Sequence, residues 1–136
     1  MILSLVKNPA SLTESAAIAA LERPDGVLIG LSHESADGRD VSWIWDVDFD
    51  PLAGIPSVGV TGTRVDDLAV RLKYSARPDA DRWPIAPIEA LPDRAIDAMI
   101  ARIPRGRTLV VLATYTALLS MREHLHRLGV VPAAPR

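Results

Sequence analysis

The chain has 136 residues, of which 15 are basic and 17 acidic, and a formal net charge of −2. This length is typical of one domain, and a hydrophobic content of 49% predicts a folded core rather than a disordered chain. The balanced charge provides no basic stripe for a phosphate backbone, so nucleic acid is not an expected partner. The absence of cysteine excludes disulfides, thiolate metal sites and a thiol nucleophile in this chain.

The amino-terminal segment bears on location and domain organisation. It lacks the basic start of a signal peptide, and no apolar run in the chain approaches the roughly 18 residues of a membrane span. A cytoplasmic protein that does not cross a membrane is therefore predicted. The chain begins inside the apolar run of residues 2–6, and a central strand seldom starts at residue two. We therefore expect another domain to precede this one.

Apolar runs alternate with amphipathic segments along the chain. The runs at 2–6, 27–31, 57–61, 85–91 and 108–113 predict strands, of which the fourth has the weakest pattern. Helices are expected from a capping box of Ser11 and Glu14 to residue 21, at 65–73, at 92–103, and at 116–128 with Gly129 as its cap. This alternation predicts an α/β domain over residues 1–130, with a Rossmann-like three-layer αβα fold and a mostly parallel sheet, followed by a tail at 131–136.

Residues 37–49 concentrate unusual side chains: two of the three Trp, the only Phe and four Asp. From 41 to 50 large apolar residues alternate with aspartates, which predicts a half-buried strand. Ile44 interrupts the alternation, so a short helical turn around Trp43 is the alternative. The segment follows the strand predicted at 27–31, and working loops of parallel sheets lie at the carboxyl ends of strands. Asn8 and residues 37–40, 61–64 and 114–116 are therefore expected to meet at one edge.

The sequence predicts neither a metal site nor a familiar nucleotide motif. His124 and His126 are two apart on a helix, so they point in different directions and are expected to be solvated. His33 either makes a specific contact or is simply one of the polar residues of this loop. Glycine-rich phosphate motifs are absent. Thr61-Gly62-Thr63-Arg64, at a helix start, is a candidate anion or substrate contact, or else a tight turn with Thr63 as the helix cap.

The aspartates of this region have two interpretations. A pair of carboxylates suits general acid–base chemistry. Alternatively, Asp37 and Asp40 are turn residues, Arg39 forms an ion pair with one of them, and the tryptophans belong to the core. The sequence pattern does not show which carboxylates face each other among Asp37, Asp40, Asp46, Asp48 and Asp50.

Four stretches give the chain a family resemblance. They are Lys7-Asn8-Pro9-Ala10, residues 36–49 with the run Asp-Gly-Arg-Asp, residues 61–73, and residues 114–119. In this order they resemble the C-terminal domain of MurT, the Mur-ligase-like subunit of lipid II isoglutaminyl synthase. The resemblance implies a Mur ligase C-terminal-domain fold and a role in ATP-dependent amidation of D-glutamate in the peptidoglycan precursor lipid II. The ammonia would come from glutamine, hydrolysed by a GatD-type glutaminase subunit with a Cys and a His.

The resemblance also implies roles for residues. Asp40 would be catalytic, completing a Cys-His-Asp triad across the subunit interface by orienting the imidazole. Loop-shaping or interface roles would belong to Asp37, Gly38, Arg39, Trp43, Trp45 and Asp46. In place of the family's Asn-Asp-Asn-like run, this chain has Ser32-His33-Glu34. No cofactor or metal is expected in this chain; ATP and Mg²⁺ would bind the Mur ligase core, which these residues do not include.

Two other functions remain open. One is a non-catalytic interaction or regulatory module for a glutaminase. The other is a small-molecule-binding Rossmann-like domain that uses residues 61–64. The resemblance places the whole complex at the cytoplasmic face of the bacterial membrane.

Overall fold

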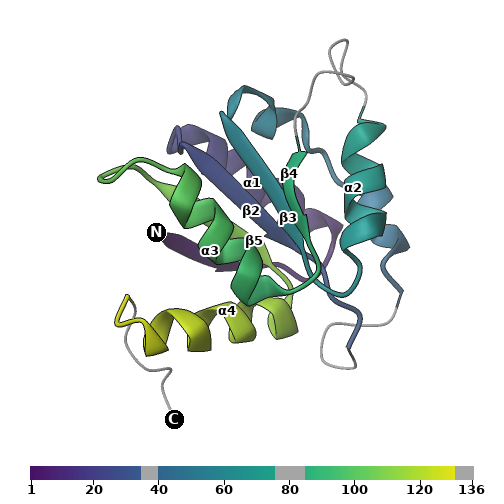
Figure 1. Cartoon of the computed structure of the whole chain (residues 1–136). Helices are drawn as coiled ribbons and strands as arrows, with labels where there is room; N and C mark the ends of the chain where they lie inside the picture. The colour runs from purple at the N-terminus through teal and green to yellow at the C-terminus, as the bar shows by residue number, and fades with distance from the viewer. Residues whose placement is uncertain (35–39, 76–84, 131–136) are drawn as a thin grey trace.

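The computed structural model describes residues 1–34, 40–75 and 85–130, so the predicted tail at 131–136 lies outside the described residues. Within these ranges, five parallel strands form one sheet in the order β1-β5-β2-β3-β4 (Figure 1). The strands are β1 (Ile2–Leu5), β2 (Gly26–Gly30), β3 (Ser57–Thr61), β4 (Ile85–Glu89) and β5 (Leu109–Ala113). The predicted strands, including the weak fourth one, are confirmed.

Helices cover both faces of the sheet. They are α1 (Pro9–Leu21), α2 (Val65–Lys73), α3 (Pro92–Arg102) and α4 (Tyr115–Arg127), with two short 3-10 helices, η1 (Ser42–Asp46) and η2 (Asp50–Gly54), between β2 and β3 in the chain. In Figure 1, α3 and α4 lie in front of the sheet and α1 behind it. The three-layer αβα prediction is therefore confirmed, with every described strand parallel.

The strand residues alternate between two cores. Val27 and Ile29 of β2 face the core formed with α1, α2, η1 and η2, whereas Leu28 faces the core formed with α3 and α4. All three side chains are at most 1% exposed. A strand that is buried on both faces consists of an unbroken run of apolar residues. The sequence pattern therefore located these strands.

The first helix begins one residue after Asn8, at the carboxyl end of β1. The Asn8 side chain accepts a 2.8 Å hydrogen bond from the Ser11 N–H, and the Ser11 hydroxyl accepts one from the Asn8 N–H at 3.1 Å. The predicted pairing of Ser11 with Glu14 is therefore wrong. Because Pro9 fits the first helical position, Ser11 becomes the third residue of the helix and the partner of the cap rather than the cap itself.

Asn8→Ala is expected to lower the free energy of unfolding by about 1 kcal/mol, because it leaves the Ser11 N–H without its cap. Urea denaturation followed by circular dichroism measures this change. Glu14→Ala is the control, since Glu14 is exposed and outside the observed cap. An equal loss in both variants would argue for the predicted pairing instead.

Residues 41–54 do not form the predicted half-buried strand. They form η1 and η2, so the helical-turn alternative for this segment is confirmed. Val41, Ile44 and Val47 are buried at spacings of three, whereas Trp45 is 53% exposed. In a 3-10 helix, residues three apart lie on one side. The burial of Ile44, which broke the alternation, explains why the strand prediction failed.

The later helices end and pack mostly as predicted. Gly129 has φ +76°, and the N–H groups of Gly129 and Val130 donate to the carbonyls of His126 and Leu125, which closes α4 as expected for a glycine cap. The spacing of apolar residues in α3 and α4 also predicts buried faces that include Ile100 and Leu128, but these side chains are 39% and 56% exposed. Ala95 takes the buried position on α3, because the neighbouring α4 packs on that side.

Candidate functional site

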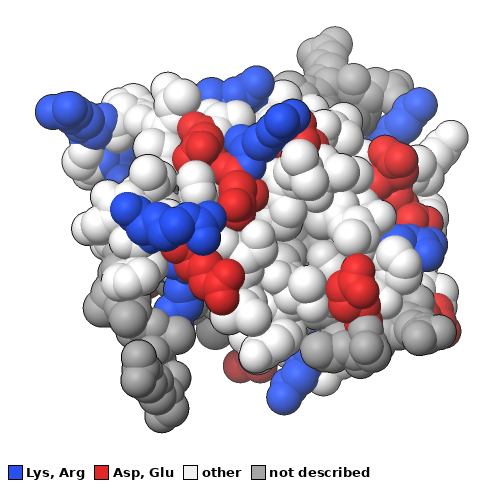
Figure 2. Space-filling model, turned by 60° about the horizontal axis from the view of Figure 1, so that its bottom comes forward, with Lys and Arg blue, Asp and Glu red and all other residues white. Residues whose placement is uncertain are grey.

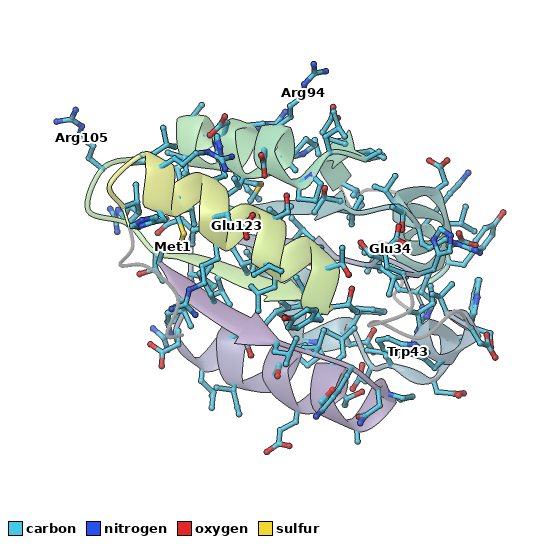
Figure 3. All side chains as sticks on the ribbon, turned by 90° about the horizontal axis from the view of Figure 1, so that it is seen from below. Met1, Glu34, Trp43, Arg94, Arg105 and Glu123 are labelled. Carbon is cyan, nitrogen blue, oxygen red and sulfur yellow. The ribbon has the colours of Figure 1, made fainter. Side chains whose placement is uncertain are left out.

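The loops that follow β2, β3 and β5 meet at the carboxyl edge of the sheet, as predicted for residues 61–64 and 114–116; residues 37–39 lie outside the described residues. The Ser32 N–H donates to the Thr114 hydroxyl at 3.0 Å, in a buried position. The N–H of His33 donates to the Thr63 hydroxyl at 3.1 Å, and His33 Nδ1 lies 2.9 Å from the same oxygen. Figure 3 shows Glu34 and Trp43 on the same side of the molecule, away from Arg105 and Met1. His33 is thus a contact residue.

Backbone N–H groups of the turn at residues 61–64 and of the residue after it are bound to carbonyls of the protein. The N–H groups of Gly62, Arg64 and Val65 donate to the carbonyls of Ala90, Leu31 and Gly62. The hydroxyl of Thr63 binds His33, and the helix that follows has no side-chain cap, so the alternative of Thr63 as a cap is wrong. The contact of this turn with an anion or substrate stays a prediction.

The guanidinium of Arg64 is engaged by a carboxylate on the first turn of α2. Its Nε lies 2.7 Å from Asp67 Oδ2. This hydrogen bond lowers the pKa of Asp67 and raises that of Arg64, and the nearby His33 lowers the pKa of Asp67 further. Because the folded pKa of Asp67 is depressed, any stabilisation by the pair is present above the ordinary aspartate pKa and is lost as the pH falls through the folded value.

Asp40 carries a carboxylate that is held by its own chain and open to solvent. Its Oδ1 accepts a 2.9 Å hydrogen bond from the Ser42 N–H, the first residue of η1. The Ser42 backbone and side chain lower the pKa of Asp40, while the residue itself is exposed. The group is therefore an ionised acceptor with one oxygen anchored. The neighbouring predicted residues Asp37, Gly38 and Arg39 lie outside the described residues.

The other predicted residues of this segment have separate surroundings. Trp43, Trp45 and Asp46 all belong to η1: Trp43 is partly buried and packs on the core, whereas Trp45 and Asp46 lie at the surface. The carboxylate of Asp48 accepts a hydrogen bond from the Asp50 N–H at 3.0 Å, so it serves its own loop. Within the described ranges, Asp40 and Asp48 each accept a hydrogen bond from a nearby backbone N–H rather than pairing with another of these carboxylates.

Arg71 of α2 holds the η1 segment in place, and sequence reasoning missed this role. Its Nε donates to the Ile44 carbonyl at 3.0 Å and its Nη2 to the Val47 carbonyl at 2.7 Å. Its guanidinium carbon also lies 5.4 Å from the ring centroid of Trp45 and 5.2 Å from that of Phe49. Burial lowers the pKa of Arg71, and the charges of two nearby aspartates oppose this effect. In the sequence, Arg71 is simply a basic residue in the last turn of a helix.

The histidine predictions need one correction. His124 is not solvated: its side chain is 18% exposed, with Nε2 2.8 Å from Asp97 Oδ1 and Nδ1 3.8 Å from Asp93 Oδ2 of α3. The close packing of α4 on α3 brings these groups together. Figure 2 shows acidic and basic side chains lying next to one another on the face it presents.

Residues 1–34, 40–75 and 85–130 contain no cluster of three or more His, Cys, Asp or Glu side chains placed to hold a metal ion. Within the same ranges, no helix is both long and apolar enough to span a bilayer.

Comparisons with known proteins match this chain to one family. The family model described as MurT ligase C-terminal matches residues 5–118. In Staphylococcus aureus strains COL and N315, proteins named "Lipid II isoglutaminyl synthase (glutamine-hydrolyzing) subunit MurT" are 34% identical to this chain over 131 residues, covering 93% of the chain and 28% of each relative. A protein of the same name in Streptococcus pneumoniae R6 is 32% identical over 129 residues, covering 90% and 27%. The chain thus spans little more than a quarter of these relatives' length. With most of its residues matched by the family model, this chain belongs to the MurT ligase C-terminal family.

Proposed function

We propose that this domain acts in a MurT-type subunit of lipid II isoglutaminyl synthase, where it docks a GatD-type glutaminase and supplies Asp40 to the glutaminase's Cys-His pair. The printed name of the relatives, which joins glutamine hydrolysis to lipid II isoglutaminyl synthesis, supports the coarser part of this proposal. The amidation of D-glutamate in lipid II would take place at the cytoplasmic face of the membrane. ATP and Mg²⁺ would bind the Mur ligase core, outside these residues.

The observation that carries the proposal is the state of the Asp40 carboxylate. A triad aspartate must be ionised, must present a free oxygen to an imidazole N–H and must hold a fixed direction. Asp40 is exposed, its pKa is lowered, and one of its oxygens is anchored to the Ser42 N–H at 2.9 Å. An exposed carboxylate of this kind suits a role completed by a partner that buries it.

The surface beside Asp40 suits a protein partner. Trp45, whose side chain is 53% exposed, lies on η1 together with the exposed Asp46. Large aromatic side chains carry much apolar area and a polar N–H, and they are enriched in protein interfaces. We infer that the glutaminase covers Trp45 as it brings its histidine to Asp40.

The proposed mechanism assigns Asp40 an electrostatic role. The glutaminase histidine takes the proton of the cysteine thiol, and the resulting thiolate attacks the carboxamide carbon of glutamine. Asp40 accepts a hydrogen bond from imidazole Nδ1–H, which selects the reactive tautomer and stabilises the imidazolium as it forms. The imidazolium gives the proton taken from the thiol to the amide nitrogen, which leaves as ammonia, and water then hydrolyses the remaining thioester to glutamate and the free thiol. Asp40 remains ionised throughout.

The test is glutamine hydrolysis by a purified GatD-type subunit alone and with the wild-type domain, Asp40→Asn or Glu123→Gln. Released glutamate is measured at saturating domain, and binding is followed by calorimetry. The wild-type domain and Glu123→Gln are expected to stimulate hydrolysis equally, because Glu123 is exposed on α4, across the sheet from η1. Asp40→Asn is expected to bind but not to stimulate, because an amide cannot supply the negative charge.

The other outcomes point to the other functions. Equal stimulation by the wild type and Asp40→Asn would contradict the triad role and leave a non-catalytic docking or regulatory module. Absence of binding to the glutaminase would contradict docking as well. In that case, thermal stabilisation by a small molecule that is lost in a Thr63→Ala variant would favour the small-molecule-binding domain.

A further inference from the structure

We propose that Arg71 is a positioning residue that holds Asp40 in its working orientation through η1, an inference that rests on the proposed function of Asp40. Arg71 lies on α2 and is separated from Asp40 by 31 positions in the chain. It does not touch the carboxylate in any contact of the described structure. Its effect must therefore pass through the backbone between residues 40 and 47.

A short series of hydrogen bonds connects the two residues. The Arg71 guanidinium binds the carbonyl of Ile44 at 3.0 Å. The N–H of Ile44 donates to the Val41 carbonyl at 3.2 Å, which closes the first turn of η1. Within that turn, the Ser42 N–H holds the Asp40 carboxylate at 2.9 Å. The direction of the carboxylate thus depends on the direction of an N–H that belongs to the turn Arg71 secures.

The second contact of Arg71 fixes the end of the same segment. Its Nη2 binds the Val47 carbonyl at 2.7 Å, so one side chain holds both ends of a stretch of four residues. The rings of Trp45 and Phe49 also lie within 5.4 Å of the guanidinium carbon. A 3-10 helix is short and weakly stabilised by its own hydrogen bonds, so such external support decides whether it keeps one conformation.

The chemistry of this contact requires arginine. A guanidinium is a rigid planar fork whose separate donors reach two carbonyls while its faces contact aromatic rings. An ammonium group is a single compact charge and cannot hold the same two carbonyls in the same geometry. Arg71 is also well anchored, because Leu68 and Leu72 on the same helix are fully buried. The fork therefore extends from a rigid element, as precise positioning requires.

The first measurement uses the free domain and needs no partner. The amide signal of Ser42, followed by NMR as the pH is lowered, reports protonation of the Asp40 carboxylate. In the wild type this titration is expected below the ordinary aspartate range, since the Ser42 hydrogen bond lowers the pKa of Asp40. In Arg71→Met the midpoint is expected to rise toward the ordinary value, because the Ser42 N–H is no longer held in place. Lys73→Met is the matched control: Lys73 is exposed on the same helix, and its charge lies over the ring of Tyr74.

The second measurement uses the reconstituted complex with the glutaminase. At saturating domain, Arg71→Met is expected to reduce stimulated glutamine hydrolysis roughly 10- to 100-fold, the order expected for a misplaced catalytic group. Arg71→Lys should restore part of the rate, and Lys73→Met should change nothing. The double variant Arg71→Met with Asp40→Asn is expected to be no slower than Asp40→Asn alone, because both changes remove the same contribution.

The outcomes separate this inference from the proposed function. An unchanged Ser42 titration and an unchanged rate in Arg71→Met would overturn the positioning role. A shifted titration in Arg71→Met, together with an Asp40→Asn variant that still stimulates hydrolysis as well as the wild type, would support the structural link while the proposed function fails. If Arg71→Met does not fold, Arg71→Lys takes its place: an unchanged titration and rate in that folded variant would equally overturn the need for a guanidinium.

Discussion

Replacing Gly62 by alanine is expected to destabilise the domain by roughly 4 kcal/mol or more, a large part of the about 5–15 kcal/mol available to a domain. Gly62 has φ +107°, a backbone conformation that residues with a side chain rarely adopt. A Cβ at this position would overlap the carbonyl oxygen of Leu31. That carbonyl, at the end of β2, accepts the Arg64 N–H at 3.0 Å, so moving it would also break the start of α2.

Gly54→Ala provides the matched control for this prediction. Nothing lies within 4 Å of a Cβ added at Gly54, and its φ is not in the left-handed region. The control variant is therefore expected to be neutral or slightly stabilising. Urea denaturation curves of the wild type and both variants measure the effect. Similar midpoints for Gly62→Ala and Gly54→Ala would show that the turn after β3 tolerates a side chain.

Phe49→Ala is expected to lower the free energy of unfolding by about 3–5 kcal/mol, the cost of a large cavity in a packed core. Phe49 is 1% exposed and belongs to the core on the α1 and α2 side of the sheet. The substitution also removes one of the two rings that contact the Arg71 guanidinium. It therefore weakens both the core and the support of η1.

The control for Phe49 is the other ring beside Arg71. Trp45 lies at a similar distance from the guanidinium but is 53% exposed. Trp45→Ala is therefore expected to cost only about 1 kcal/mol or less, the range of an exposed cation–π contact. Thermal and urea unfolding of the two variants distinguish these values. A loss of equal size in both would mean that the contact with Arg71, and not burial, dominates the role of Phe49.

Local sequence patterns were sufficient to predict the layers of this fold. The run Leu109-Val110-Val111-Leu112 contains no polar residue because β5 is an interior strand, paired with β1 and β2, and buries both faces. Gly129 likewise marked the end of α4 because only the left-handed conformation closes that helix. Burial of both strand faces and closure of a helix each depend on residues that are neighbours in the sequence, so a short stretch of sequence is enough to predict them.

The arrangement around Asp40 depends on contacts between distant residues and could not be predicted in this way. Arg71 binds backbone carbonyls 24 and 27 positions earlier in the chain. Because every residue has such a carbonyl, the sequence does not show which of them a side chain binds. The pairing of His124 with Asp97, 27 positions away, was missed for the same reason. The catalytic role proposed for Asp40 rests on the family resemblance; the structure adds that its carboxylate is exposed and is anchored to the Ser42 N–H.

The position of β5 between β1 and β2 determines the order in which the sheet can be completed. Of the described strands, β1 leaves the ribosome first, yet the strand it pairs with, β5, leaves last. The nascent chain must therefore keep the apolar residues of β1 unpaired until more than a hundred further residues have followed. Such a delay is the condition under which chaperones bind unpaired strands. A fragment that stops before Leu109 would lack the strand that joins β1 to the rest of the sheet, and so could not shield β1 however long it was given to fold.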